Sequence, residues 1–180
     1  MPTQSDLHPD WPTVPACYGW LSLDRRGVWR LRGEPVVHPG LSRFISANYE
    51  ADEHGNWLVN NGPQKVYVTL DYTPWVMRLD TDGTLCTHTG RLAGELEAVH
   101  LDDEGNVLLA TAFGPGLLSD RDLPAFLADC CLADGRAADD EALLGLMAGK
   151  GGVFWRGMPL TCILGNELEA RYHFNAAPTA

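Results

Sequence analysis

The segment that decides the fold is LDRRGVWRLRGEPVVHPGLSRFISAN, residues 23–48, because its outline returns later in the chain. The second copy is LDDEGNVLLATAFGPGLLSDRDLPAFLADC, residues 101–130, aligned with a gap of a few residues before the helix. Each copy predicts a β-hairpin that leads through a Gly and Pro bend into an amphipathic helix. Chance agreement between short patterns is the alternative to an internal repeat.

An Asp-x-x-Gly tetrad occurs four times, as DRRG (24–27), DEHG (52–55), DTDG (80–83) and DDEG (102–105). Asp at the first position and Gly at the fourth are typical of a type I turn, in which the carboxylate accepts a backbone amide and Gly takes the positive φ that follows. A calcium loop needs further oxygen ligands at alternate positions and a closing Glu. We therefore interpret the tetrads as turns and predict no metal site.

The pattern around the first copy predicts an antiparallel sheet with one solvated face. A helix is expected at about 39–50, with Leu41, Phe44, Ile45 and Tyr49 on one face. NWLV, QKVYVTL and PWVMRLD follow as strand-like segments, and Val66, Val68 and Leu70 alternate with polar residues in the second of them. An extended arm precedes the sheet, and we expect Trp11 and Trp20 to hold it against the body.

The second copy continues with a helix that the first copy lacks. Its first helix is expected to be capped by Asp120 or Asp122, since Pro124 must lie in the first turn. The additional helix is ADDEALLGLMAGKGG (138–152), with Leu143, Leu146 and Met147 along one stripe. The segments GGVFWRGMPLTCIL and ELEARYHF are predicted to be strands.

These patterns together predict an α+β protein of two pseudo-repeated halves. Each half is expected to be a small, mostly antiparallel sheet packed against one or two amphipathic helices. The expected organisation is an extended arm at 1–20, a first half at 21–92 and a second half at 93–180, packed as one compact unit.

Composition indicates a folded, acidic protein. Of the 180 residues 45% are hydrophobic, and the formal net charge is -11, which disfavours nucleic acid and anionic membranes as partners. The N-terminus lacks a basic segment followed by an apolar one, and no apolar run is long enough to span a membrane. We expect a cytoplasmic protein. The five cysteines form no C-x-x-C motif, so buried free thiols are predicted.

No motif supports a specific chemistry. GLMAGKGG (145–152) is one residue short of a phosphate-binding loop and ends a helix where such a loop would begin one. The six histidines show no zinc spacing, and Cys86 with His88 supplies only two ligands. No G-x-S-x-G elbow occurs. The sequence therefore predicts no catalytic residue and no cofactor.

One group of polar side chains is a candidate ligand site. Lys65, Tyr67 and Thr69 share one face of a strand, with Arg78 on the following segment and His38 at the helix entrance. A cation beside an aromatic ring and hydroxyls can hold a small polar or anionic molecule by charge-assisted hydrogen bonds. A solvated strand face is the alternative reading of the same residues.

The order of short motifs along the chain resembles a widespread proteobacterial family of unknown function, whose members are built from two similar α+β halves. The resemblance rests on Gly27-x-Trp29, Arg32-Gly33-x-Pro35, Leu41, Phe44, Gly55-x-Trp57-Leu58-Val59, Lys65-Val66-x-Val68, Asp71-x-x-Pro74-Trp75-Val76, Thr87-x-x-Gly90, Leu118-x-x-Arg121 and Gly152-Val153-Phe154-Trp155. The chain departs from the family pattern at Val37, His38 and Gln64. The resemblance implies at most a signalling or regulatory role and transfers no site.

Three functions are consistent with the sequence. The first is a non-enzymatic regulatory or signalling module that binds a small polar ligand or a protein partner. The second is an enzyme of the hydrolase type, whose titratable groups near His38, His88, His100 or the acidic turns meet only in space. The third is an assembly protein that forms a homodimer through an exposed aromatic patch.

Overall fold

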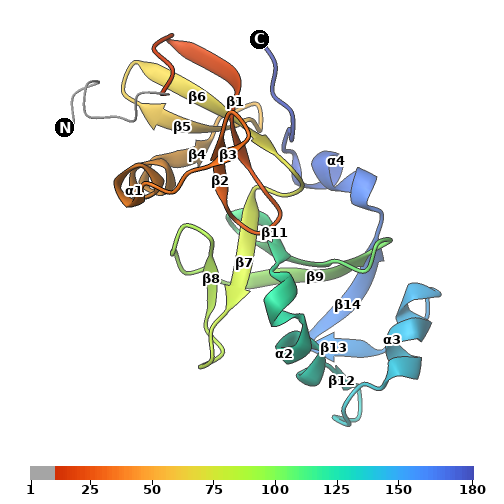
Figure 1. The fold of residues 1–180 in the computed structure, drawn as a ribbon. Helices are drawn as coiled ribbons and strands as arrows, with labels where there is room; N and C mark the ends of the chain where they lie inside the picture. The colour runs from red at the N-terminus through yellow and green to blue at the C-terminus, as the bar shows by residue number, and fades with distance from the viewer. Residues whose placement is uncertain (1–10) are drawn as a thin grey trace. The chain divides into compact units, whose positions relative to one another are not determined.

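The computed structural model describes residues 11–180, and the chain forms two compact units (Figure 1). The first unit runs to Pro74 and includes the C-terminal segment His173–Ala180, whereas the second unit is Trp75–Tyr172. The expected boundary between 92 and 93 therefore lies inside the second unit. The difference arises because residues 75–79 pair with a later strand of that unit, while the C-terminal segment returns to the first, where the Leu70 amide donates to the Ala176 carbonyl.

As far as residues 11–180 describe it, the first unit is a six-stranded sheet in the order β3-β2-β1-β6-β5-β4 with one helix. All neighbouring strands are antiparallel except the central pair β1 and β6, which is parallel. Its elements are β1 (Ala16–Leu23), β2 (Trp29–Leu31), β3 (Glu34–Pro35), α1 (Pro39–Ala47), β4 (Tyr49–Ala51), β5 (Trp57–Asn61) and β6 (Gln64–Leu70).

Strand β6 confirms the predicted alternation, since Val66, Val68 and Leu70 are buried and Lys65 is exposed. The helix ends at Ala47, three residues earlier than expected, because the Asn48 side chain donates to the Phe44 carbonyl and Tyr49 begins β4. Tyr49 is therefore buried as a strand residue, and its assignment to the helix was wrong.

The extended arm ends at Pro15, earlier than expected, because β1 begins at Ala16; residues 1–10 of the arm lie outside the described part of the chain. Trp11 does hold the arm, since its buried indole donates to Gln64 Oε1 at 2.9 Å. The Gln64 amide in turn donates to the Pro12 and Val14 carbonyls. Trp20 lies within β1 and is half-buried.

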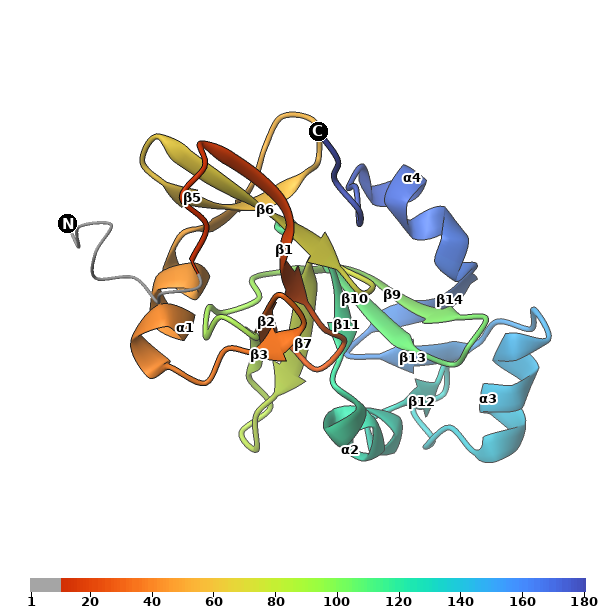
Figure 2. The ribbon, with the colours of Figure 1, turned by 45° about the horizontal axis from the view of Figure 1, so that its top comes forward.

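The second unit is an eight-stranded sheet in the order β12-β13-β14-β9-β10-β11-β7-β8, with three helices (Figure 2). Its strands are β7 (Trp75–Leu79), β8 (Leu85–Thr87), β9 (Leu96–Asp102), β10 (Val107–Thr111), β11 (Gly114–Leu118), β12 (Cys131–Leu132), β13 (Val153–Trp155) and β14 (Met158–Ile163). Its helices are α2 (Leu123–Ala128), α3 (Asp140–Met147) and α4 (Leu168–Tyr172).

The topology confirms two like halves. Six strands of the second sheet, read as β11-β10-β9-β14-β13-β12, repeat the order of the first sheet, and their central pair, β9 and β14, is again parallel. Helix α2 follows β11 as α1 follows β3, and α3 is the predicted additional helix. The second sheet differs in carrying the hairpin β7-β8 beyond β11.

Several local expectations need correction. ELEARYHF is not a strand: its Leu168–Tyr172 part is helix α4, consistent with the helix propensity of Leu, Glu, Ala and Arg. Neither Asp120 nor Asp122 caps α2 with its side chain; Asp122 Oδ2 instead accepts the Leu79 amide. In α3, Asp139 caps the helix, but only Leu146 is buried and Met147 is largely exposed.

The Asp-x-x-Gly tetrads are turns. Oδ1 of Asp24, Asp52 and Asp102 each accepts two backbone amides, those two and four residues ahead. The glycines that close the four tetrads have φ between 80° and 85°. In residues 11–180 no group of three or more His, Cys, Asp or Glu side chains is placed to hold a metal ion.

All five cysteines are free, and Cys17 and Cys130 are buried as predicted. Cys162 is exposed, contrary to the expectation, and its thiol donates to the Leu146 carbonyl. Within the described residues, the helices are too short or too polar to cross a bilayer.

Candidate functional site

The four predicted ligand-binding residues lie on different parts of the structure. Lys65 and Tyr67 lie on β6, where the Tyr67 ring stacks on Tyr18 at 4.4 Å. Arg78 is exposed on β7 and belongs to the second unit. His38 precedes α1 and lines a groove of the first unit. That all four side chains form one ligand site stays a prediction.

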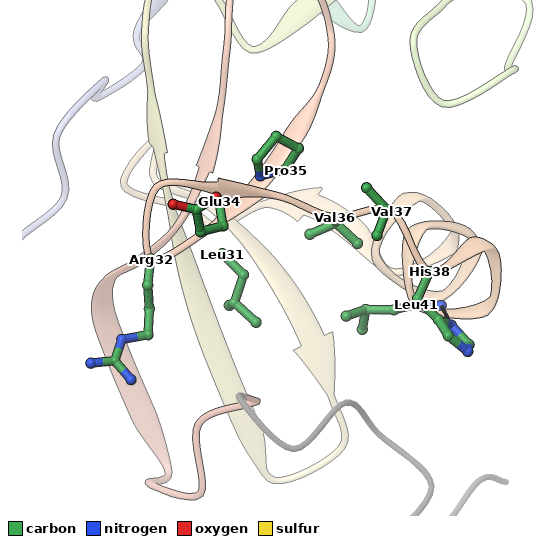
Figure 3. A pocket seen from close by; sticks show the side chains of 8 residues that line it. All are labelled: Leu31, Arg32, Glu34, Pro35, Val36, Val37, His38 and Leu41. Carbon is green, nitrogen blue, oxygen red and sulfur yellow. Dashed lines mark hydrogen bonds between the residues drawn. The ribbon is translucent and has the colours of Figure 1, made fainter.

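The groove has a volume of about 270 Å³ and lies where β3 leads into α1 (Figure 3). It is lined by Leu31, Arg32, Glu34, Pro35, Val36, Val37, His38 and Leu41. Figure 3 shows the Leu31, Val36 and Leu41 side chains converging on one side of this segment, whereas Pro35 and Val37 point to the other. Leu31 and Leu41 are buried, and together with Val36 they form the apolar floor of the groove.

A tight hairpin sets one end of the groove. Arg32 and Gly33 connect β2 to β3 with φ values of 52° and 86°, both positive, as a two-residue hairpin turn of type I′ requires. The Arg32 amide donates to the Trp20 carbonyl, and its guanidinium lies 4.9 Å from the centre of the Trp20 ring. The backbone and this cation–π contact hold a positive charge at the mouth of the groove.

The helix start sets the other end. His38 is the N-cap of α1, and its Nδ1 accepts the Leu41 amide at 3.2 Å, while Pro39 fits the first turn. A Cβ on residue 40 would lie 3.0 Å from the imidazole Cε1, so Gly40 leaves room for the ring. Because Nδ1 acts as an acceptor, the neutral imidazole carries its proton on Nε2, which is available as a donor.

The groove combines an apolar floor with polar groups at both ends. Arg32 supplies a cation and His38 a hydrogen-bond donor, and Glu34 is the one carboxylate in the lining. Among the groove residues, no hydrogen bond joins two titratable side chains. The arrangement suits binding of an apolar group that carries a polar or anionic end, and it lacks the coupled nucleophile and base of hydrolytic sites.

Of the residues that line the groove, only His38 was predicted from the sequence as a site residue. A signal was present, because Val36 and Val37 lie between Pro35 and Pro39 in a segment that leaves the sheet. Adjacent residues of an extended chain point to opposite sides, so at least one of two consecutive valines at an edge is exposed. Val37 is 87% exposed.

A buried polar cluster around His100 in the second unit was not predicted as a site from the sequence. In the second unit His100 is 1% exposed and lies between Thr161 Oγ1, 2.7 Å from Nδ1, and Tyr172 Oη, 2.5 Å from Nε2. Burial, and then the positive charge of Arg171, lower the pKa of His100 to about 4. The group joins α4 to β9 and β14 and offers no open surface for a substrate.

Fold and groove define a class: a duplicated α+β protein with an apolar groove at the open edge of its first sheet. The model of the DUF2944 family, described as "Protein of unknown function (DUF2946)", matches residues 7–179. The chain belongs to this family, which confirms the resemblance to a family of unknown function. No curated protein matches the chain.

Two solved structures are similar in fold. A DUF1285 family protein from Silicibacter pomeroyi DSS-3 matches with a TM-score of 0.54 and 18% identity, over 86% of this chain and 84% of the other. A DUF1285 family protein from Shewanella baltica OS155 matches with a TM-score of 0.46 and 16% identity, over 59% of this chain and 89% of the other. At this identity the first likeness concerns the fold alone.

Proposed function

We propose that the protein is a cytoplasmic, non-enzymatic regulatory module that holds a ligand or a protein partner in the groove between β3 and α1. The observation that carries this proposal is the apolar floor of Leu31, Val36 and Leu41, which lies between Arg32 at one end and His38 at the other. Apolar surface removed from water contributes about 25 cal/mol per Å², and the polar ends would orient what binds.

Charge supports a ligand with an anionic or acceptor group at its end. The chain carries a formal net charge of -11, yet two of the three titratable side chains in the groove lining are basic. With His38 neutral, the charges of Arg32 and Glu34 offset each other, so an anionic group meets less repulsion in the groove than on the acidic surface elsewhere, and it can accept from Arg32 and from the His38 imidazole.

Binding of the anionic apolar dye anilinonaphthalene sulfonate tests the location of the site. The double variant Arg32→Asn/His38→Asn removes the cation and the imidazole donor and should weaken dye binding about tenfold or more, because an anionic dye group loses charge-assisted contacts at both ends of the groove. Asn tolerates the positive φ of residue 32 and caps helices well, so the fold should persist. Fluorescence titration gives the affinity, and backbone NMR shifts locate the dye.

Lys65→Asn is the matched control, because it removes a cation from β6 outside the groove. If the dye binds the double variant as tightly as the wild type, the groove is not the site. If Lys65→Asn alone abolishes binding, the ligand site is the face of β6.

The face of β6 is a second candidate ligand site. The stacked rings of Tyr18 and Tyr67, which are 4° from parallel, favour this site. Strand β1 bulges between Cys17 and Leu21, and Tyr18 lies within this bulge. Lys65 lies two residues before Tyr67 on the same side of the strand.

Lys65→Ala should change the free energy of unfolding by no more than about 0.5 kcal/mol, because the side chain is exposed. Urea denaturation measures this value. A steep loss of stability would show that Lys65 is structural and would remove this second candidate.

A further inference from the structure

The duplication shows what occupies the position of the groove in the second sheet. There, β7 lies parallel to β11, with Trp75, Val76 and Met77 opposite Gly116, Leu117 and Leu118. The pairing continues past the end of β11, where the Ser119 amide donates to the Met77 carbonyl at 2.9 Å. Strand β7 thus covers both the edge strand of the repeat and the segment that leads into its helix.

Among residues 11–180, the first sheet has no such strand. Strand β3 occupies the place of β11 in the repeat and is the last strand of its sheet. The groove residues 34–38 are β3 and the segment that leads into α1, so the groove adjoins the edge at which a counterpart of β7 would pair. The same architecture is closed by a strand in one half and open in the other.

The backbone of the open edge is arranged for a parallel strand. The Val36 amide points inward, since it donates to the Trp29 carbonyl at 2.8 Å. Backbone groups alternate in direction along an extended chain, so the Pro35 carbonyl and the Val37 amide point outward. A carbonyl and the amide two residues later bracket a single residue of a parallel partner, as Leu117 and Ser119 bracket Met77.

Pro35 limits the number of backbone hydrogen bonds that a partner strand can form with β3, but it does not prevent the pairing. Pro35 has no amide proton, so only one pair of hydrogen bonds can form at this edge. Within residues 11–180 the Val37 amide has no hydrogen-bond partner. The remaining affinity must come from side chains, and both sides of the segment are apolar: Leu31, Val36 and Leu41 on one, Pro35 and Val37 on the other.

We infer that an extended segment of a partner protein adds to β3 as a parallel strand, with one residue held between the Pro35 carbonyl and the Val37 amide. The inference rests on the proposed function and specifies its ligand. The segment carries aliphatic side chains at alternate positions, as β7 does against β11. A groove of about 270 Å³ lies below the usual size of a metabolite site but accommodates one or two such side chains.

The test uses the full chain and short random peptides presented by a display library. Peptides selected on the wild-type protein are synthesised, and their affinities are measured for the wild type, Val37→Pro and Val37→Ala. We expect Val37→Pro to weaken binding about tenfold or more, because it removes the amide donor, and Val37→Ala, which keeps the donor, to weaken it less. Melting curves check that both variants fold.

Amide hydrogen exchange of the wild type gives a second readout that needs no variant. Bound peptide should slow exchange at Val37 and leave β4, the other edge strand of the first sheet, unchanged. The inference is overturned if no peptide is selected, if selected peptides bind Val37→Pro as tightly as Val37→Ala, or if the Val37 amide stays unprotected. A dimer of the wild type that Val37→Pro dissociates would identify a second copy, and not a partner protein, as the occupant.

The dye experiment separates the two proposals. If the dye binds in the groove but no peptide is selected, the proposed site stands and only the inference of strand addition is contradicted. If the dye binds the Arg32→Asn/His38→Asn variant as tightly as the wild type, the proposed site itself is contradicted.

Discussion

Trp155→Ala should lower the free energy of unfolding by roughly 4 kcal/mol, which is the range for truncating a fully buried aromatic residue. Trp155 lies on β13 with no exposed surface, and its ring centre is 5.0 Å from that of Phe126 on α2. The Arg156 guanidinium lies 4.4 Å from the same ring. Truncation would leave a cavity between α2 and the sheet, and urea denaturation measures the loss.

Trp155→Phe is the matched control. The indole Nε1 of Trp155 is buried without a hydrogen-bond partner among the described residues. Phenylalanine removes this unpaired donor and keeps most of the apolar contact with Phe126, so the two effects offset each other in part. We expect Trp155→Phe to cost less than about 1.5 kcal/mol. Equal losses for the alanine and phenylalanine variants would contradict the packing described for α2.

Acidification from pH 6.5 to pH 4 should remove about 3 kcal/mol of stability through His100, whose pKa burial and Arg171 lower from 6.5 to about 4. The unfolded chain binds a proton at His100 in this interval and the folded chain does not. Stability therefore falls as the pH falls, and the His100 contribution levels off below pH 4 and above pH 6.5.

The hydrogen bonds explain why neutral His100 is preferred. Thr161 Oγ1 donates to the Val99 carbonyl and so accepts from His100 Nδ1, which leaves Nε2 to accept the Tyr172 hydroxyl. Protonation would place a second donor on Nε2 against the Tyr172 proton, beside the charge of Arg171. Burial, and to a smaller extent the negative charge of Glu97 on β9, raise the pKa of Tyr172 above its usual value, so its hydroxyl keeps the proton that it donates.

His100→Gln provides the comparison, since its amide can occupy the position of Nε2 but does not titrate. Urea midpoints of the wild type and the variant, measured at about pH 7 and about pH 4.5, give the His100 contribution as a difference. Other groups such as Asp52, whose pKa is lowered by its turn hydrogen bonds, affect both proteins alike. Parallel pH profiles for the two proteins would disprove the buried neutral His100.

Local features of the fold were predictable from the sequence because each depends on neighbouring residues. The Asp-x-x-Gly turns, the alternation in β6 and the start of α1 at Pro39 all satisfy backbone groups or bury side chains within a few residues. The repeat was also visible, since both copies carry the same series of such local signals. Of the candidate site, only His38 was found by this reasoning.

The amino-acid sequence by itself determined the turns, the start of α1 and the two similar halves, since these follow from short-range chemistry. The tertiary structure alone decided the parallel pairing of β1 with β6 and of β9 with β14, and the addition of β7 to the second sheet. Those pairings join residues far apart in the chain, where many partners satisfy the same backbone groups and packing selects one. The groove at β3 results from that selection, because a strand completes the edge of one sheet and leaves the other open.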